Sequence, residues 1–320
     1  MQSYKDIKMS TEQELARVSP GKDTLLTIGI FDGVHRGHQY LLGELIKEAR
    51  KKNLLSGVVT FRQHPQAVLS PGRGLSLLDD LTERERLLKQ AGVDIVIILS
   101  FSRELANIGP ERFLDWLKKY LRVRGLVIGY DFALGTGRQG DTEKLQKLGQ
   151  EMGFSVRVIA PFKVGREVVS STTIRQALSQ GDMARVTRLL GRPFSLHGRV
   201  VTGDSRGKRL GYPTANLMIN PEQALPTDGV YVSLAHTGDK SYPAMTYIGC
   251  RPTFGEKKQM VESYLINFEG DLYNQEITIE IKYHLRGDQK FESAQALSKQ
   301  ISEDVARGLK LLGETEKKNA

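Results

Sequence analysis

The amino-acid sequence predicts an α/β protein in two parts: a parallel β-sheet flanked by helices, followed by a small antiparallel β-barrel with a terminal helix. Strands and helices alternate through the first half, which is the pattern of a doubly wound sheet. Gly191-Arg192-Pro193 interrupts that alternation, and short strands separated by turns then continue without a helix until about Ser293. Because 320 residues can form two hydrophobic cores, we expect domains at 1–187 and 188–320.

The first half begins with an apolar, β-branched run at 25–30, which predicts a strand, and an amphipathic helix begins near His38. The segment 62–80 contains two prolines and two glycines and is expected to be a loop. A capping box at Thr82 predicts the start of another helix. Further strands are expected at 56–61, 93–101, 126–130 and 154–159, and further helices at 110–121, 142–152 and 183–190. Ligands of such a sheet bind at the carboxyl ends of its strands.

The second half reads as antiparallel strands joined by turns, of which Thr237-Gly238-Asp239 is a hairpin turn. A closed or partly closed barrel is the economical arrangement of so many short strands. Leu297, Ile301 and Val305 recur every four residues and predict a helix that packs on that barrel, and only 315–320 is expected to be disordered. The strands are expected at 194–201, 230–236, 242–248, 261–268 and 275–285.

The composition is that of a soluble globular protein, with 39% hydrophobic and 26% charged residues. The formal net charge of +9 is spread along the chain without a dense basic block, so it suits polyphosphate substrates as well as nucleic acid. Cys250 is the only cysteine, which excludes intramolecular disulfides and cysteine-based zinc sites. The chain has no apolar run of membrane-spanning length and starts with a polar segment, 1–11, so a cytoplasmic location is expected.

The first candidate site is the turn between the first strand and its helix. Backbone N–H groups and the positive end of the helix dipole meet there, which favours an anion. His35 and His38 are three residues apart with Gly37 between them, and both can donate to phosphate oxygens. Asp131 and Phe132 follow the strand at 126–130 and therefore fall at the same edge of the sheet.

A second polar run, Ser170-Ser171-Thr172-Thr173-Ile174-Arg175, opens another helix. Its hydroxyl groups are either simple N-caps or, together with Arg175 and the helix N–H groups, a second phosphate clamp. The residues alone leave these two interpretations open.

The densest motif of the chain is the stretch 198–217, in which a strand leads into a loop with four glycines and three cationic residues, Arg206, Lys208 and Arg209. Glycines let backbone amides approach phosphate, although a solvated basic hairpin has the same composition. Thr214 and Asn216 occupy alternate positions of a strand and share one face, where their oxygens suit Mg²⁺.

These motifs resemble two known sequence sets. The string G-I-F-D-G-V-H-R-G-H-Q at 29–39 resembles the N-terminal motif of bacterial FAD synthetases, which contains the H-x-G-H signature of nucleotidyltransferases, and the run 170–175 resembles their S-S-T-x-I-R motif. The stretch 198–217 resembles the signature of riboflavin kinases, and the segments 249–255 and 261–264 with Tyr273, Arg286 and Phe291 resemble its later blocks. One departure is Tyr247 where that family has an asparagine.

The chain therefore resembles the bacterial bifunctional riboflavin kinase/FAD synthetase family. The resemblance implies a Rossmann-like nucleotidyltransferase domain and a six-stranded riboflavin kinase barrel, which use ATP and Mg²⁺ to convert riboflavin to FMN and FMN to FAD. It implies that Glu262 is the general base of the kinase and that Thr214 and Asn216 hold Mg²⁺. Stabilisation of charge during nucleotide transfer is implied for His35, His38, Ser171, Thr172 and Arg175.

The resemblance also implies a set of substrate-binding residues, in which His64 belongs to a family H-P element with Pro65. The set comprises Gly29, Phe31, Asp32, Gly33, His64, Asp131, Phe132, Ser171, Thr172, Gly203, Ser205, Gly207, Lys208, Tyr212 and Arg286. The expected partners are riboflavin, FMN, FAD and ATP, with no nucleic acid and no membrane, and the protein is expected to be a monomer or a weak homo-oligomer. A single-activity enzyme and a flavin-sensing regulator are the alternatives, and the intact motifs in both halves argue against each.

Overall fold

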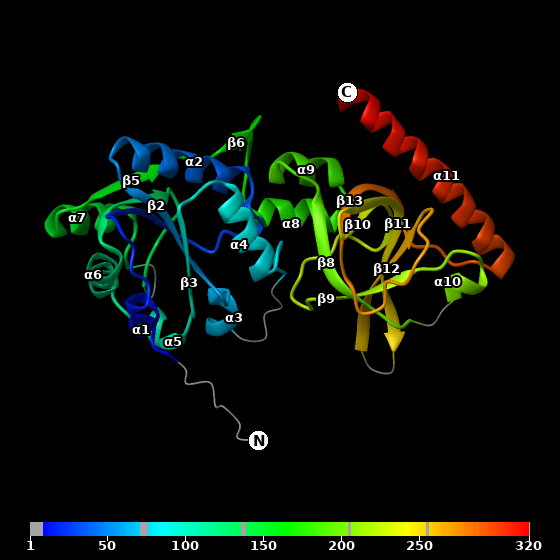
Figure 1. Ribbon diagram of the computed structural model, residues 1–320, viewed down its shortest axis with the longest axis horizontal. Helices are drawn as coiled ribbons and strands as arrows, with labels where there is room; N and C mark the ends of the chain where they lie inside the picture. The colour runs from blue at the N-terminus through cyan, green and yellow to red at the C-terminus, as the bar shows by residue number, and fades with distance from the viewer. Residues whose placement is uncertain (1–8, 71–75, 136–138, 204–205, 254–255, 320) are drawn as a thin grey trace, which may run out of the picture. The chain divides into compact units, whose positions relative to one another are not determined.

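The structure is a computed structural model that describes residues 9–70, 76–135, 139–203, 206–253 and 256–319, and it divides into two compact units (Figure 1). The first unit comprises Met1–Leu75 and Asp80–Val169, and the second comprises Ser76–Asp79 and Ser170–Ala320. This division groups the helical segment that begins at Ser171 with the second unit. The domain boundary expected at 187/188 stays a prediction.

The first unit is built on a parallel sheet with the strand order β3-β2-β1-β4-β5, as the fold class predicts. β1 lies in the middle, and the order reverses between β1 and β4, so ligands are expected at the carboxyl ends of these two strands. The strands are β1 (Thr24–Ile28), β2 (Leu55–Phe61), β3 (Ile95–Leu99), β4 (Val123–Gly129) and β5 (Ser155–Ile159).

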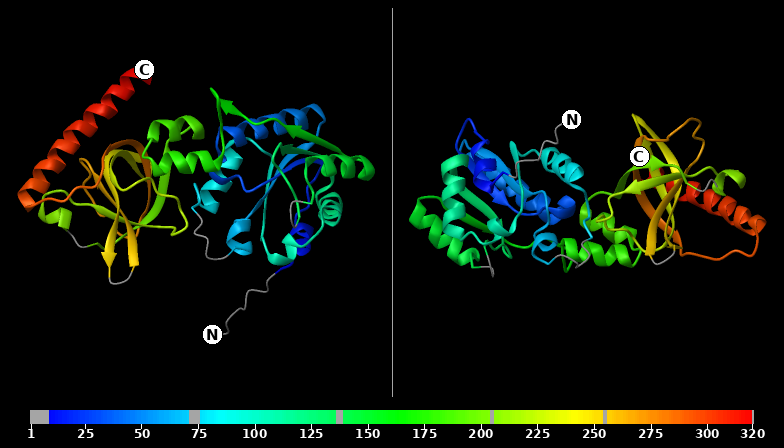
Figure 2. Two further views of the ribbon diagram at one scale, coloured as in Figure 1. Left: turned by 180° about the vertical axis from the view of Figure 1, so that it is seen from behind. Right: turned by 90° about the horizontal axis from the view of Figure 1, so that it is seen from below.

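Helices cover both faces of this sheet, because alternate side chains of each strand point to opposite sides. Leu25, Val58 and Val127 pack against α2 (Arg36–Lys51) and α4 (Leu81–Gln90). The other face packs against a second group of helices, and Figures 1 and 2 show α2 on one side of the sheet with α1 and α6 on the other. This second group consists of α1 (Thr11–Ala16), α5 (Arg103–Ala106), α6 (Pro110–Leu121) and α7 (Thr142–Met152). The remaining elements are η1 (Asp32–Val34), α3 (Pro65–Leu69), β6 (Lys163–Val164) and β7 (Glu167–Val168).

Two sequence-based expectations for the first unit are wrong. The segment expected to be a loop contains α3, because Pro65 fits the first position of a helix and the Nδ1 atom of His64 accepts the Gln66 N–H at 3.2 Å. α4 is capped by Asp80 rather than Thr82, since the Asp80 carboxylate accepts the N–H of Glu83 at 2.8 Å.

The second unit is a closed barrel of six antiparallel strands in the order β10-β11-β12-β9-β8-β13, which confirms the predicted architecture. The strands are β8 (Phe194–Val201), β9 (Ala215–Ile219), β10 (Gly229–Thr237), β11 (Lys240–Thr253), β12 (Glu256–Leu265) and β13 (Glu276–Arg286). The helices of this unit are α8 (Ser171–Ser179), α9 (Met183–Leu190), α10 (Arg206–Arg209) and α11 (Ala294–Asn319). The four-residue helix α10 is not expected from the sequence, because it lies within the predicted glycine-rich loop.

The terminal helix α11 packs on the barrel through Val305, Leu311 and Leu312, as the apolar spacing predicts. Its backbone continues to Asn319, so the disorder expected from residue 315 is wrong over that range. In the part of the chain that the structure describes, no helix has both the length and the apolar character required to cross a membrane.

Candidate active sites

The turn between β1 and α2 has a strained backbone. Phe31, Gly33 and Val34 have φ angles of 55°, 81° and 33°, and only the glycine adopts such a conformation without steric cost. Strain of this kind persists where the surrounding structure fixes it, and it concentrates at functional sites. The turn delivers His35 to the N-cap position of α2.

His35 and His38 form a stacked pair at this helix start, with ring centroids 3.7 Å apart and an interplanar angle of 15°. The Nδ1 atom of His35 accepts the backbone N–H of His38 at 3.3 Å, so the ring proton of a neutral His35 is on Nε2. A Cβ on Gly37 would lie 3.1 Å from the His35 ring and 3.2 Å from the Val169 carbonyl, which is why glycine separates the histidines. His35 therefore acts as a helix cap through Nδ1, and in the neutral ring the N–H is on Nε2.

His38 is the electrostatically unusual member of the pair. Burial, and then the charges of His35 and Arg84, hold the pKa of the His38 imidazole well below its usual range. Its Nδ1 atom is buried and has no hydrogen-bond partner among the residues that the structure describes. His38 is consequently neutral at pH 7, and any contribution to binding phosphate comes through a neutral N–H and not through charge.

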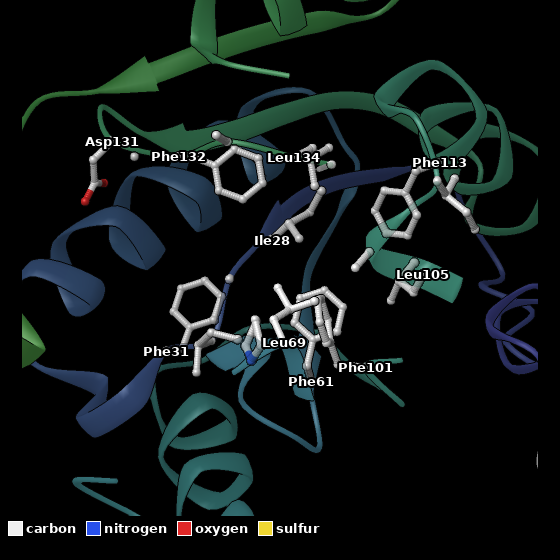
Figure 3. Close-up of a pocket in the computed structure, with 18 of the residues that line it drawn as sticks. Ile28, Phe31, Phe61, Leu69, Phe101, Leu105, Phe113, Asp131, Phe132 and Leu134 are labelled. Atoms are coloured by element: carbon white, nitrogen blue, oxygen red, sulfur yellow. The ribbon is translucent and has the colours of Figure 1, made fainter. Parts of the chain in front are cut away.

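A cavity of about 590 Å³ opens beside this turn, at the carboxyl ends of β1 and β4. Five predicted residues line it together: Gly29, Phe31, His38, Asp131 and Phe132. Figure 3 shows the rings of Phe31 and Phe61 on one side of the cavity, Phe132 on the other and the Asp131 carboxylate at one end. The volume and the aromatic walls suit a flat ring system, with the polar groups at the end near α2.

Sequence reasoning missed most of the apolar wall of this cavity. Phe61, Leu69, Phe101, Leu105 and Phe113 line it, and in the sequence none of them differs from an ordinary core or loop position. Only Phe61 and Phe101, which end the strands expected at 56–61 and 93–101, carry a sequence signal for this edge of the sheet.

Other predicted residues of the first half have different places. Asp32 and Gly33 are buried in the turn η1, and His64 is the N-cap of α3. Ser171, Thr172 and Arg175 lie on α8, in the second compact unit, where the Nε atom of Arg175 donates to the carbonyl of Ser76.

The hydroxyl group of Ser170 caps α8 by accepting the N–H of Thr173 at 3.2 Å. The N-cap interpretation of this polar run is therefore confirmed for Ser170. The phosphate-clamp interpretation of the run stays a prediction.

A second cavity, of about 410 Å³, lies on the outer face of the barrel. It is bordered by β11, β12, α11 and the segment after β13. The predicted residues that line it are Gly207, Tyr212, Thr214, Glu262 and Arg286. The sequence alone does not determine which face of β12 carries the site. Val261 and Ser263 are buried and Glu262 lines the cavity, so the catalytic candidate faces outward.

Three side chains form a row across neighbouring strands at this cavity. Glu262 is directly opposite Tyr247 of β11 on one side and Asn216 of β9 on the other, and residues paired in this way point to the same face. Thr214 lines the same cavity two residues before Asn216. Carboxylate, amide and hydroxyl oxygens thus converge, which fits a Mg²⁺ ion that also binds substrate phosphates.

Two glycines of the 198–217 motif are packed against this row. A Cβ on Gly203 would overlap the side chain of Asn216, and a Cβ on Gly207 would overlap the backbone carbonyl of Tyr212 and lie 3.3 Å from the Thr214 hydroxyl. Lys208 is exposed on α10, and Ser205 lies outside the described residues. The close approach of the Asn216 side chain to Gly203, and of the Tyr212 carbonyl to Gly207, explains why glycine is required at both positions.

Arg286 and Tyr247 connect the barrel to the segment that follows β13. The Arg286 Nε atom is 2.9 Å from Oδ2 of Asp304 on α11, and its guanidinium lies 5.6 Å from the centre of the Phe291 ring. The Tyr247 hydroxyl donates to Asp288, and burial followed by the nearby carboxylates, of which Asp288 has the largest effect, raises the pKa of this phenol. Sequence reasoning noted Tyr247 as a departure and did not place it in the site.

A doubly wound sheet with a histidine pair at its switch point, joined to a barrel with a carboxylate-lined cavity, defines a protein of nucleotide and phosphate chemistry. A family model for FAD synthetase matches residues 19–173, and one for riboflavin kinase matches residues 190–312. The bifunctional riboflavin kinase/FMN adenylyltransferase of Escherichia coli K12 is 39% identical, over 93% of this chain and 95% of that protein. The protein of the same name from Pseudomonas fluorescens is 38% identical, over 88% and 90%.

The chain belongs to the family of bifunctional riboflavin kinases/FMN adenylyltransferases. Among solved structures, a crystal structure from Streptococcus pneumoniae matches with a TM-score of 0.84 and 31% identity, over 91% of this chain and 95% of that chain. That protein is described as a macrolide-efflux protein. The match shows that the fold of both units recurs in a relative.

Proposed function

We propose that this protein makes FAD in two steps, first phosphorylating riboflavin with ATP to give FMN and then joining FMN to AMP from a second ATP. The observation that carries the proposal is the presence of two cavities, one in each compact unit. Each is lined by residues of the corresponding family motif.

The kinase step belongs to the barrel. Glu262 accepts the proton of the riboflavin 5′-hydroxyl as that oxygen attacks the γ-phosphorus of ATP, and ADP leaves. Gly207 and Tyr212 border the cavity, Gly203 allows Asn216 to take its position, and Lys208 on α10 is proposed to contact the phosphates of ATP. Thr214 and Asn216 would hold Mg²⁺, which supplies neutralisation of phosphate charge when bound.

The adenylyl-transfer step belongs to the first unit. An oxygen of the FMN phosphate attacks the α-phosphorus of ATP, the bond to the β-phosphate oxygen breaks, and pyrophosphate leaves. His35 donates through Nε2, His38 donates as a neutral imidazole, and the N–H groups at the start of α2 face the same anion. The aromatic cavity takes the flavin ring of FMN, and Asp131 borders its polar end.

The role proposed for Ser171, Thr172 and Arg175 is to bind phosphate in this second step. Support comes from the resemblance of the run 170–175 to the S-S-T-x-I-R motif. The cytoplasmic location, the absence of nucleic-acid and membrane partners, and the monomeric or weakly oligomeric state also stay predictions.

A time course of both products tests the proposal. Purified protein is incubated with riboflavin, ATP and Mg²⁺, and FMN and FAD are separated by chromatography. FMN should appear first and FAD should follow, and chelation of divalent metal should stop both. Accumulation of FMN without FAD would instead support an enzyme with a single activity, and formation of neither would contradict the proposal.

A further inference from the structure

Arg84 is one of the few charged side chains that the first unit buries completely, with 1% of its surface exposed. It lies on α4, and its Nη1 atom donates to the carbonyl of Phe61 at 3.0 Å and to the carbonyl of Ile30 at 3.2 Å. These carbonyls stand at the carboxyl ends of β2 and β1. A buried guanidinium is unfavourable unless it is well hydrogen-bonded, so its position at these two strand ends calls for an explanation.

The Ile30 carbonyl accepts hydrogen bonds from two side chains. Besides Arg84, the buried Thr60 hydroxyl donates to it at 3.1 Å. The next residue is Phe31, with which the strained turn begins. A turn with several positive φ angles keeps one conformation only when its ends are fixed, and the Ile30 carbonyl is such a fixed point.

The conformation of the turn reaches the reacting groups through Phe31. The Phe31 ring meets the His38 ring edge-on, with centroids 5.1 Å apart, and both line the cavity. His38 in turn stacks on His35. A shift of the Ile30 carbonyl therefore moves the phenyl ring against which the histidine pair is packed.

We propose that Arg84 is a positioning residue for adenylyl transfer, which fixes the end of β1 against β2 and thereby holds the turn from Phe31 to His38 in the geometry that the reaction needs. The inference rests on the proposed function, because it concerns the same site. Arg84 does not line the cavity, and it acts through the backbone and through the charge that it places behind the turn.

Because Arg84 is charged, its removal can also be followed through the pKa of His38, which is a measurement independent of activity. Arg84 is one of the groups that depress the pKa of His38, so removing its charge raises that pKa. The other titratable groups around His38 are His35 at the same helix start and Asp131 in the same cavity, and both are unchanged in an Arg84 variant.

The test compares Arg84→Met and Arg84→Lys with Arg86→Met, which removes an exposed arginine from the same helix. FAD formation from supplied FMN and ATP, FMN formation from riboflavin, and the NMR titration of His38 are measured for each. We expect Arg84→Met to lower kcat of adenylyl transfer by about 10- to 100-fold, the scale of a displaced reacting group, with little change in KM for FMN. Arg84→Lys should recover part of that loss, and the kinase rate should not change.

A second variant tests the role of the Ile30 carbonyl alone, because it removes a hydrogen bond to that carbonyl and changes no charge. Thr60→Val keeps the shape of the side chain and removes the other donor, so it should lower kcat of adenylyl transfer in the same direction and leave the His38 titration unchanged. It also serves if Arg84→Met does not fold.

The inference is overturned if Arg84→Lys and Thr60→Val both keep the wild-type kcat, or if Arg84→Met leaves both kcat and the His38 titration as they are in Arg86→Met. If the unaltered protein makes no FAD from FMN and ATP, the proposed function fails and not this inference.

Discussion

At the scale of single residues, His38 combines a depressed pKa with a buried Nδ1 atom that has no partner among the described residues. An unsatisfied buried polar atom lowers stability by about 1–3 kcal/mol. Such an atom in a folded protein is therefore explained best by a hydrogen bond that it makes to a ligand. The His38 imidazole thus stays neutral at a pH at which a surface histidine, with a pKa near 6.5, already gains a proton.

We expect His38→Ala to lower FAD formation by roughly 10²–10³-fold, the effect of losing one donor that stabilises developing charge. FMN formation from riboflavin should hardly change, because that reaction uses the other cavity. Product chromatography with riboflavin, and separately with FMN, distinguishes the two effects. Near-normal FAD synthesis by a folded variant would reduce this histidine to a packing role.

The same residue predicts a pH effect on stability. The folded-state pKa of His38 is depressed, so below about pH 6.5 the unfolded chain binds a proton that the folded chain does not. This residue should therefore make the free energy of unfolding fall as the pH drops from about 6.5. Urea unfolding at several pH values should show a steeper fall for the wild type than for His38→Ala, and equal slopes would contradict the depressed pKa.

A substitution of Glu262 tests the kinase site, as His38→Ala tests the adenylyl-transfer site. Glu262→Gln keeps the size of the side chain and cannot accept the proton, so kinase kcat should fall by roughly 10²–10⁴-fold while ATP still binds. Synthesis of FAD from supplied FMN should be unaffected. Glu280→Gln, which changes a carboxylate of β13 that pairs with Lys282, is the matched control. An unchanged turnover in Glu262→Gln would place the base elsewhere.

The sequence predicted the motif residues and not their surroundings. Gly29, Phe31, His38, Asp131 and Phe132 do meet in one cavity, since a strand, a turn and a helix start determine local geometry. The aromatic wall around them could not be predicted, because residues far apart in the sequence form it. Tyr247 and Asp304 were missed for the same reason, as each acts through a partner on another element.

At the scale of elements, three buried hydroxyl groups connect neighbouring strands inside the barrel. The Thr246 hydroxyl of β11 lies 2.6 Å from that of Ser233 on β10 and 3.0 Å from that of Ser263 on β12. All three residues are fully buried, and apart from the Ala244 carbonyl, to which the Ser233 hydroxyl donates at 3.2 Å, the hydrogen bonds of this row are between the hydroxyls themselves. This row lies on the side of the strands opposite to Glu262 and Tyr247, so it supports the sheet that carries the site.

Thr246→Val should therefore lower the free energy of unfolding by about 1–3 kcal/mol, because it leaves the hydroxyl of Ser263 without this partner and removes one partner of Ser233. Thr246→Ser keeps the hydroxyl and should cost less. Urea denaturation measures both, and kinase kcat should be unchanged in each. A Thr246→Val protein as stable as the wild type would show that the row contributes nothing to folding.

The predicted bounds of a helix or strand agree with the structure where the local sequence signals are unambiguous. α6, α7 and β8 match their predicted ranges, since a proline or an aspartate starts each helix and the apolar period continues through it. α3 was missed because the prolines and glycines of the segment 62–80 favour a loop, and α4 was assigned the wrong cap because Asp80 and Thr82 both suit that position. Tertiary contacts decide such cases.

At the scale of the whole molecule, the pair α8 and α9 is packed within the second unit. The N–H of Thr227, which precedes β10, donates to the carbonyl of Leu178 at 3.1 Å. A Cβ on Gly181 would lie 3.0 Å from Thr227 and 3.1 Å from His284. The sequence continues its strand–helix alternation through this pair, and periodicity alone does not show against which core a helix packs.

Two fragments test whether α8 and α9 belong to the core of the second unit. The fragments 170–320 and 188–320 both contain the barrel, the cavity with Glu262 and the helix α11, so each should make FMN if it folds. Neither contains His35 or His38, so neither should make FAD. The shorter fragment lacks buried residues of α8 and α9, among them Ile174, Leu178 and Val186, and exposes the surface that they cover. It should therefore unfold at a lower temperature by circular dichroism. Equal melting temperatures would show that α8 and α9 add nothing to the core of the second unit, and a folded 170–320 without kinase activity would show that the first unit contributes to the kinase site.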